Sequence, residues 1–364
     1  MSQIIGHVDL DYFYAQVEEV GRPDLKGRPV IICVFSGRTD ESGVVSTANY
    51  VARDYGVRSG MPISLAKKKL EGSSPELIRM DHEKYAEVSD RVMEIIRASV
   101  DRLEQTGIDE AFFDITKLTD GDYELAQELG ARLKGSVLDA EGLTCSVGIA
   151  RSKAVAKIAS DYRKPDGLTV VRASETESFL SPLPVSRLSG VGPKAARALE
   201  SIRVETLGDL ASADINDLVR LMGRKLGSYL WEAAHGEDRD PVREKPMTQL
   251  SRIITLKENT SDPEAALNQL KPVVDDLRVR LLTTKQSFRV VSVLGILGDL
   301  TMKTKSKTFE NPVSDPTHLS GEVTGLLPLL FRSTGREFRR VGVRVSDLQG
   351  SLDQTSLAQY TEGA

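Results

Sequence analysis

Acidic side chains at the ends of two predicted strands are the residues of this chain most suited to chemistry. In the first stretch, residues 7–14 read HVDLDYFY and overlap the apolar, β-branched segment from Ile4 to Val8. That segment has the pattern of a buried strand, which places Asp9 at the strand end. A carboxylate there is costly unless a cation neutralises it, and Mg²⁺ prefers oxygen ligands. Taken alone, the stretch is equally compatible with a surface acid backed by core aromatics.

The second acidic stretch supplies two more carboxylates. Residues 106–115 read TGIDEAFFDI, and strand-like runs at 100–108 and 111–115 flank Asp109 and Glu110 as a hairpin. An Asp-Glu turn alone is ordinary turn chemistry. Three acids on neighbouring strand ends, however, would repel one another without cations. With two metal ions roughly 3.5–4 Å apart, the same arrangement clamps a phosphoryl transfer.

Together the two stretches resemble the paired acidic motifs of the Y-family DNA polymerases, translesion enzymes of the DNA polymerase IV type, and their archaeal members most closely. The resemblance extends from Ile4 to about Gly350. It implies low-fidelity, template-directed DNA synthesis past damaged bases, with nucleotidyl transfer from a dNTP to a primer 3′-hydroxyl. It also implies that Asp9, Asp109 and Glu110 are catalytic and hold two Mg²⁺ ions.

The resemblance assigns further residues near these acids. The backbone carbonyl of Leu10 is implied as an additional metal ligand, and Tyr14 as a steric gate that clashes with a ribose 2′-hydroxyl. The family often has Ser where this chain has Gly107, which predicts the loss of a local hydrogen bond and not of the metal site. Asp114 is expected to be a structural hairpin acid instead of a metal ligand.

A segment after the first strand predicts nucleotide binding. Tyr50 and Arg53 lie three residues apart on one helical face, with Thr47 nearby, and such side chains can hold a triphosphate through charge-assisted and hydroxyl hydrogen bonds. An ordinary amphipathic helix is the alternative. The resemblance implies a wider dNTP site made of Phe13, Tyr14, Ser46, Thr47, Tyr50, Arg53 and Lys157. It also implies an open roof over the nascent base pair, and hence low fidelity, lined by Val34, Val44, Gly60 and Met80.

Apolar spacing and the resemblance together predict an α+β multidomain fold. Strand, helix, hairpin, helix and strand predict a ferredoxin-like palm with helices on one face, its helices at 84–100, 124–138 and 152–163. The implied domains are the palm (1–20 and 78–166), small fingers (21–77), a helical thumb with a helix–hairpin–helix (167–235), a linker (236–246) and an α+β little finger (247–350). In the little finger, strands at 249–257, 287–295, 302–309 and 339–345 alternate with helices at 263–285 and 321–331.

Two regions are candidates for contacting primer–template DNA without reading its sequence. Gly190 and Gly192 precede a predicted helix, so that backbone N–H groups can approach a phosphate, with Lys194 beside them. The little-finger candidates, which lie on predicted strands, are Arg252, Lys303, Lys305, Lys307, Arg339 and Arg340. The three lysines alternate along one strand and therefore share a face. A solvated, charged edge strand is the alternative for them.

The composition fits a large intracellular enzyme. The chain has 364 residues and a net charge of −5, a length that suggests about two to four domains. Residues 243–350 nevertheless hold 17 Lys and Arg against 12 Asp and Glu, so an acidic chain contains a basic part.

Cys33 and Cys145 are expected to be reduced core residues, and four scattered histidines predict no zinc site. With no long apolar run and no signal-peptide pattern, we expect a cytoplasmic protein without membrane contact. We also expect a monomer.

The last residues predict one protein partner. Gln354, Leu357 and Tyr360 are spaced by three and resemble the peptide that docks on a sliding clamp, although Thr361 stands where a second aromatic is usual. A disordered polar tail over residues 351–364 is the alternative.

Two other functions stay open. A nucleotidyl cyclase also uses paired carboxylates on a ferredoxin-like sheet, but the helix–hairpin–helix and the basic C-terminal domain have no purpose for a free nucleotide. A non-catalytic DNA-binding scaffold would not need three acids, a gate and triphosphate-facing residues. The sequence therefore favours a polymerase.

Overall fold

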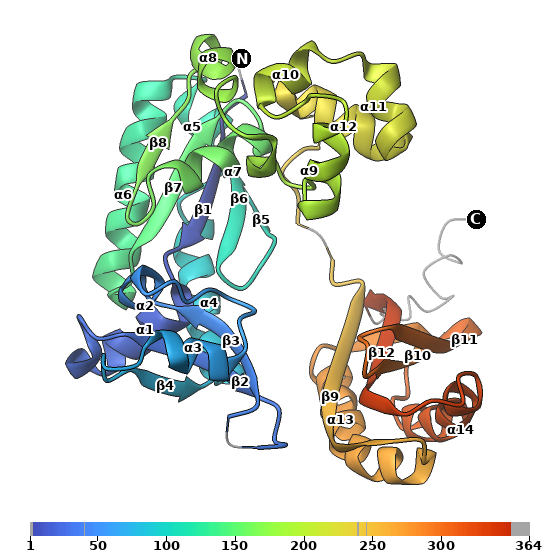
Figure 1. The fold of residues 1–364 in the computed structure, drawn as a ribbon. Helices are drawn as coiled ribbons and strands as arrows, with labels where there is room; N and C mark the ends of the chain where they lie inside the picture. The colour runs from blue at the N-terminus through green and yellow to red at the C-terminus, as the bar shows by residue number, and fades with distance from the viewer. Residues whose placement is uncertain (1–2, 40, 239, 245, 351–364) are drawn as a thin grey trace, which may run out of the picture. The chain divides into compact units, whose positions relative to one another are not determined.

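The computed structural model describes residues 3–39, 41–238, 240–244 and 246–350 (Figure 1). The chain divides into two compact units, one formed by residues 1–34, 45–61 and 65–245 and the other by residues 35–44, 62–64 and 246–364. Residues Gln354, Leu357 and Tyr360 of the predicted clamp peptide lie outside the described residues. Within the described ranges, no helix has both the length and the apolar character needed to cross a membrane.

The first unit is built on a five-stranded sheet, here the palm sheet, in the order β5-β6-β1-β7-β8. Its strands are β1 (Ile5–Leu10), β5 (Arg102–Gln105), β6 (Glu110–Asp114), β7 (Cys145–Ala150) and β8 (Leu168–Val170). β1 is central and pairs antiparallel with both β6 and β7, so the β5–β6 hairpin lies directly beside it. The predicted buried strand and acidic hairpin are confirmed.

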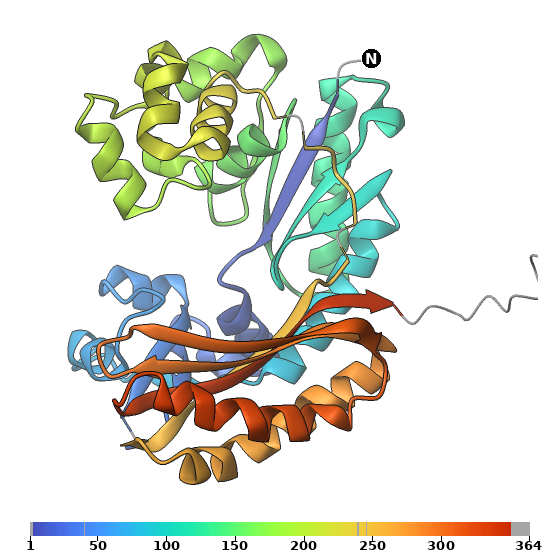
Figure 2. The ribbon, with the colours of Figure 1, turned by 90° about the vertical axis from the view of Figure 1, so that its right-hand side faces the viewer.

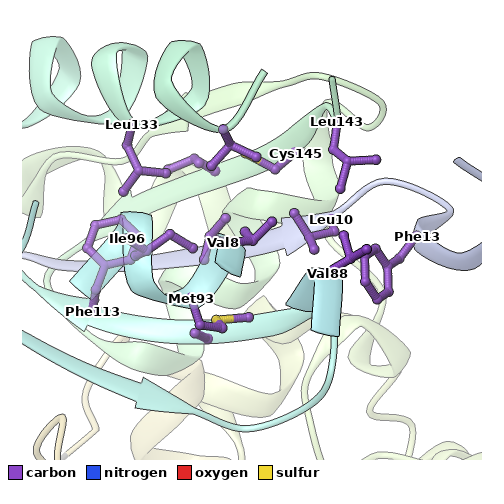
Figure 3. Packing of buried hydrophobic residues seen from close by; sticks show 14 of the residues in the cluster. Val8, Leu10, Phe13, Val88, Met93, Ile96, Phe113, Leu133, Leu143 and Cys145 are labelled. Atoms are coloured by element: carbon purple, nitrogen blue, oxygen red, sulfur yellow. The ribbon is translucent and has the colours of Figure 1, made fainter. Parts of the chain in front are cut away.

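Helices cover both faces of the palm sheet. α4 (His82–Arg97) and α6 (Tyr123–Glu141) share one hydrophobic core with Val8 and Leu10 of β1 (Figure 3). α7 (Lys153–Tyr162) packs with Ile5 in the core of the opposite face. Our prediction of helices on one face only is wrong, because the side chains of β1 alternate and Ile5, on the other face, also has to be covered.

The helices that cover the palm sheet start at capping side chains. Asp81, Asp122 and Ser152 each accept a hydrogen bond from a backbone N–H in the first turn of α4, α6 and α7. Behind the cap, apolar residues recur at helical spacing, as Val92 and Ile96 do in α4, and bury one side of the helix. The predicted helix boundaries are correct to within about one turn.

The close approach of α7 to β7 depends on Gly148. A Cβ built there would lie 2.1 Å from the carbonyl oxygen of Ala156 and 2.3 Å from the backbone nitrogen of Ser160. We expect Gly148→Ala to lower the free energy of unfolding by about 1–3 kcal/mol, because backbone atoms cannot swing aside as a side chain does. Urea unfolding measures the change. Gly135→Ala on α6 is the control and should not lower stability, since its added Cβ meets nothing within 4 Å. Equal stability of Gly148→Ala and the wild type would contradict this packing.

Short elements make up the rest of residues 11–245. A three-stranded sheet in the order β3-β2-β4 consists of β2 (Val30–Phe35), β3 (Gly43–Ala48) and β4 (Glu76–Arg79). The helices of the same sequence region are α1 (Phe13–Gly21), α2 (Tyr50–Asp54) and α3 (Ile63–Lys69), and α5 (Thr116–Thr119) follows β6. Further along the chain come α8 (Thr176–Leu180), α9 (Pro193–Glu200), α10 (Leu207–Ser212), α11 (Ile215–Met222) and α12 (Arg224–Ala234). These last five helices are the short helices predicted for the thumb.

The second unit contains a four-stranded sheet, here the little-finger sheet, in the order β11-β10-β12-β9. Along the chain come β9 (Gln249–Thr260), α13 (Pro263–Thr283), β10 (Gln286–Leu297), β11 (Met302–Val313), α14 (His318–Arg332) and β12 (Phe338–Gly350), in the predicted order. α13 and α14 pack on one face of the sheet, where they cover Val291, Val341 and Val343 (Figure 2). The little-finger sheet therefore has a helix-covered face and an opposite face.

Candidate active site

The three predicted carboxylates meet at one end of the palm sheet. Asp9, near the end of β1, is paired in register with Glu110, the first residue of β6. The N–H of Leu10 donates to the carbonyl oxygen of Asp109 at 2.8 Å, which fixes the hairpin turn beside the strand end. Because side chains alternate along a strand, Asp9 and His7 share the side of β1 that faces α7.

Two lysines form ion pairs with two of these carboxylates, those of Asp9 and Glu110. The Nζ of Lys164 lies 2.7 Å from Oδ1 of Asp9 and 2.9 Å from Oδ1 of Asp161. Lys157, on α7, forms an ion pair with Glu110. Lys157 was predicted to lie near a nucleotide, whereas Lys164 was not predicted. The available signal was a basic residue in front of the Pro-Asp-Gly turn that ends α7 and returns the chain to the sheet.

Asp11 anchors the loop that carries the second lysine. Its carboxylate accepts hydrogen bonds from the backbone N–H of Asp166 at 2.8 Å and from the hydroxyls of Thr144 at 2.9 Å and Ser146 at 2.8 Å. Asp11 is 1% exposed, and three donors offset the cost of burying its carboxylate. The second aspartate of the first acidic stretch therefore ties the loop with Lys164 to the start of β7.

The environment shifts the pKa values of the three acids in different directions. Burial raises the pKa of Asp9 to about 6. Burial and the adjacent charge of Glu110 raise the pKa of Asp109. The ammonium of Lys157, which forms an ion pair with Glu110, lowers the pKa of that carboxyl. A cluster in which two of three carboxyls resist ionisation favours additional positive charge.

The donor set at this end of the sheet fits a divalent cation. Carboxylate oxygens of Asp9, Asp109 and Glu110 and the backbone carbonyl of Leu10 are ligands of the kind that Mg²⁺ takes. As they stand, no three acidic, His or Cys side chains of the described residues converge closely enough to hold an ion. Lysine ammonium groups are paired with two of the carboxylates instead. A cation must therefore compete with these ammonium groups for the same oxygens.

Asp109→Asn should make the cation-free protein more stable. Because its pKa is raised, the folded state favours the neutral carboxyl, and ionisation costs stability as the pH rises from about 3.9 through the raised value. Asn is neutral at every pH, so the gain in the free energy of unfolding should be absent near pH 3.5 and present at pH 8. Thermal unfolding in EDTA at both pH values measures it. A loss of stability at pH 8, or an equal change at both pH values, would contradict the electrostatics of the site.

Tyr14 lies at the start of α1, directly after the first acidic stretch. Its ring stacks on that of Tyr85, with centroids 4.6 Å apart and planes 20° apart. Burial and the charge of Asp109 raise the pKa of the Tyr14 hydroxyl. Phe13, in contrast, is 2% exposed and belongs to the core (Figure 3), so only its backbone is available to a nucleotide.

The predicted triphosphate residues share one face of α2. The guanidinium carbon of Arg53 lies 4.8 Å from the centre of the Tyr50 ring, and Nε of Arg53 donates to the carbonyl of Ala48 at 2.9 Å. Ser46 and Thr47 lie on β3, just before this helix. The helical face is confirmed, and contact with a triphosphate stays a prediction.

The predicted roof residues differ in their surroundings. Val34 is 44% exposed, and Val44 is half-buried. Gly60 is exposed and has a φ of +82°, a conformation that favours glycine. Met80 packs against the edge of the hydrophobic core of the palm sheet. Their place over a base pair stays a prediction.

Two of the short helices after residue 176 begin directly after a glycine. Gly190 has a φ of +92°, and Gly192 precedes α9 without a side-chain cap, so the first N–H groups of α9 remain available. Lys194 is exposed on the first turn. α12 starts in the same way after Gly223, whose φ is +80°. Both starts suit contact with a phosphate.

The register of the little-finger sheet decides which face its lysines occupy. Lys305 and Lys307 on β11 are paired with Val293 and Val291, which lie in the core beneath the helices. Lys307 also forms an ion pair with Glu322 of α14, with Nζ 2.6 Å from Oε1. The alternating lysines therefore share a face, as predicted, and it is the helix-covered face.

The arginines of this sheet divide between its faces. Arg252 lies on the helix-covered face, where its Nε is 3.0 Å from Oδ2 of Asp276 on α13. Arg340 and Arg344 lie on the opposite face, because the odd-numbered residues between them enter the core, and Arg339 lies at a shift of register. Among the described residues, Nε of Arg340 and Nε of Arg344 are buried without a hydrogen-bond partner. Arg344 was not predicted, although alternation along the strand from Arg340 places it on the same face.

Family models match most of the chain. Residues 8–161 match the model described as "impB/mucB/samB family", and residues 247–358 match its C-terminal domain. Residues 186–238 match "DNA polymerase-iota, thumb domain".

Whole proteins and solved structures match over nearly the full length. The chain is 43% identical to "DNA polymerase IV" of Methanosarcina acetivorans, with 99% of this chain and 100% of that protein covered. It is 38% identical to "DNA polymerase IV" of Nitrosopumilus maritimus, with 99% of each covered. Among solved structures it is similar to "Y-family DNA polymerase chimera Dbh-Dpo4(243-245)-Dbh" (TM-score 0.89) and "Insertion ternary complex of Dbh DNA polymerase" (TM-score 0.72). Each is 34% identical and covers 95% of this chain and 99% of its own.

Proposed function

The chain belongs to the Y family of DNA polymerases and is a DNA-directed DNA polymerase of the archaeal type, and we propose that it extends primers past damaged template bases at low fidelity. The observation that carries this proposal is the register pairing of Asp9 with Glu110 beside Asp109, with lysine ammonium groups on the carboxylates. Such a site offers ligands for cations and positive charge for a triphosphate. Extension of an annealed primer across a damaged template base, by the wild-type chain with Mg²⁺ and the four dNTPs, tests it.

Divalent-cation dependence follows from membership in this family. We assign two Mg²⁺ ions to Asp9, Asp109, Glu110 and the carbonyl of Leu10. When bound, these ions would activate the primer 3′-hydroxyl and neutralise charge on the pyrophosphate that leaves. Asp9 must be ionised to serve as a ligand, and with a pKa of about 6 it is ionised at neutral pH.

Cations of the protein face the triphosphate in this account. Lys157 and Lys164, which hold carboxylates in the structure, exchange them for phosphate oxygens. Arg53 and Tyr50 on α2, with Thr47 before it, bind the outer phosphates. Their side chains supply the charged and hydroxyl donors that a triphosphate requires.

Two groups of residues select the nucleotide in this proposal. They are the aromatic residues at the start of α1 and the roof residues over the nascent base pair. Tyr14 excludes a ribose 2′-hydroxyl, while Phe13 contributes through its backbone and Ser46 through its hydroxyl. The residues of the roof, which leave the base pair loosely enclosed, are Val34, Val44, Gly60 and Met80. Weak enclosure gives little discrimination between correct and incorrect pairs, which is the physical reason for low fidelity and for tolerance of damaged bases.

Binding of primer–template DNA combines two surfaces. The first N–H groups of α9, with Gly190, Gly192 and Lys194, contact the phosphate backbone. On the little-finger sheet we favour the face of Arg340 and Arg344, because Arg252 and Lys307 on the helix-covered face are engaged by Asp276 and Glu322. The edge-strand lysines, with Arg252 and Arg339, are the other candidates for this domain.

Salt dependence separates the two faces of the little-finger sheet. We expect the double substitution Arg340→Ala and Arg344→Ala to reduce the slope of log K against log salt by about 2, because each phosphate contact contributes about 0.9. Fluorescence anisotropy of a labelled primer–template between about 50 and 200 mM NaCl measures the slope. The matched control, Lys303→Ala with Lys305→Ala, should keep the slope of the wild type. Loss of the slope in the lysine variant alone would assign the contact to the edge strand.

Other properties are proposed from the sequence. These are docking of a sliding clamp on Gln354, Leu357 and Tyr360, and action as a monomer. The nucleotidyl cyclase and the non-catalytic scaffold are set aside, because relatives named DNA polymerase IV match nearly the whole chain.

A further inference from the structure

His7 is a buried imidazole beside the carboxylates, and none of the roles proposed for metal or nucleotide binding involves it. It lies on β1 between Phe112 of β6 and Gly148 of β7 and has no exposed surface. Its Nδ1 is 2.8 Å from Oγ of Ser160, and its Nε2 is 3.4 Å from Nζ of Lys157. The same Nε2 is 3.6 Å from Oε2 of Glu110. Because both ring nitrogens lie close to polar partners, this imidazole does more than fill space in the core.

The hydrogen-bond network assigns the proton of this ring. The hydroxyl of Ser160 has one hydrogen, which it donates to the carbonyl of Lys157 at 2.8 Å. Ser160 must therefore accept from Nδ1–H of His7, and in the neutral ring Nε2 is left with a lone pair. The lone pair then faces the ammonium of Lys157.

We propose that His7 is a positioning residue, which holds the ammonium of Lys157 at the place where it meets the triphosphate. The inference rests on the proposed role of Lys157 in binding dNTP. In the structure this ammonium has two acceptors, a carboxylate oxygen of Glu110 and Nε2 of His7. If Glu110 gives its oxygen to a cation, His7 remains as the acceptor that keeps Lys157 beside the site.

The fold keeps the ring from turning away. Phe112 packs on the imidazole, with ring centroids 4.6 Å apart. Ser160 and Lys157 are three residues apart on α7 and so face the ring together. α7 lies this close to the sheet because Gly148, opposite His7 on β7, has no side chain. Both nitrogens of the ring are therefore tied to the same helix.

Two amide substitutions separate the nitrogens of the ring. His7→Gln places an amide near the position of Nε2 and can still accept from Lys157, whereas His7→Asn places it near Nδ1 and keeps only Ser160. We expect His7→Asn to raise KM for dNTP about tenfold, the loss of one hydrogen bond to a charged group, with kcat changed less than about twofold. His7→Gln should stay within about threefold of the wild type in both constants.

The comparison of these variants isolates positioning from packing. Each loses one hydrogen bond in the same buried place, so a purely structural role would lower the melting temperature and shift KM equally in both. Equal KM values for His7→Asn and His7→Gln would therefore overturn the proposal.

A double-mutant cycle with Lys157→Met gives a second test. If His7 acts through the lysine, His7→Asn should change KM for dNTP by less than about twofold once Lys157 is replaced. A tenfold rise that persists in the Lys157→Met background would show that His7 acts by another route, and the proposal would be wrong.

Nitrogen NMR tests the assignment without any catalysis. The chain has four histidines, so ¹⁵N-histidine labelling gives few signals, and His7→Asn identifies that of His7 by its disappearance. We expect the Nδ1-protonated tautomer, with a shift of the Nε2 signal on Lys157→Met. A proton on Nε2 would overturn the proposal. An inactive wild type with the expected NMR signals would refute the proposed polymerase activity and leave the His7–Lys157 contact standing.

Discussion

Asp109→Asn is expected to lower kcat for primer extension by at least about 10³-fold. Removal of one metal-binding carboxylate takes away transition-state stabilisation of about 4 kcal/mol or more, which corresponds to this factor. Asp109 lies in the turn that the N–H of Leu10 fixes beside the end of β1, so no other carboxylate of the hairpin takes its place. Single-turnover incorporation of one dNTP at saturating Mg²⁺ measures the loss.

The same substitution is expected to leave the protein folded. Asp109→Asn should raise the stability of the cation-free protein at pH 8, so inactivity accompanied by a higher melting temperature cannot be ascribed to unfolding. Asp114→Asn is the matched control on the same hairpin. Asp114 pairs with Ile5 at the far end of β6 and accepts from the N–H of Thr116, so its loss should leave kcat within about twofold. Near-normal activity of Asp109→Asn would contradict the assignment.

Tyr14→Ala is expected to admit ribonucleotides. The ring lies at the start of α1, directly after the first acidic stretch, and stacks on the ring of Tyr85. Removing it opens space for a 2′-hydroxyl, and we expect the preference for dNTP over rNTP, expressed as a ratio of kcat/KM, to fall by about 100-fold. The ratio is measured with matched deoxy- and ribonucleotides on one template.

Tyr14→Phe is the control for this prediction. It keeps the ring and its stacking on Tyr85 while removing the hydroxyl, so discrimination should be close to that of the wild type. If Tyr14→Phe loses discrimination as fully as Tyr14→Ala, the hydroxyl would be the selective group and a steric gate would be the wrong explanation. If neither substitution changes the ratio, Tyr14 is not the gate.

The sequence predicted the elements that carry the acids, because the signals for them are local. An apolar β-branched run, two acids at a turn and a second apolar run identify β1 and the β5–β6 hairpin. Capping residues and helical spacing likewise identify α4, α6 and α7. The pairing of Asp9 with Glu110 could be predicted because both residues lie at strand ends.

The rest depended on information that a single sequence does not contain. Lys164 reaches Asp9 because a loop anchored on Asp11 turns it back, and that anchor joins residues more than a hundred positions apart. The lysines of β11 were correctly placed on one face. Alternation shows that these lysines share a face, but it does not show which face of the sheet that is. Their pairing with Val291 and Val293 identifies it as the helix-covered face. His7 gave no signal, because its partners Ser160 and Lys157 approach across the sheet.

The most direct test of this account is incorporation opposite each of the four template bases. The wild-type chain is incubated with a primer–template, Mg²⁺ and one dNTP at a time, on four templates that differ only in the first unpaired base. We predict that the complementary nucleotide is added most efficiently on every template, and that EDTA stops all addition. Tight binding of the primer–template without extension, or addition of the same nucleotide on every template, would contradict template-directed synthesis at these three carboxylates.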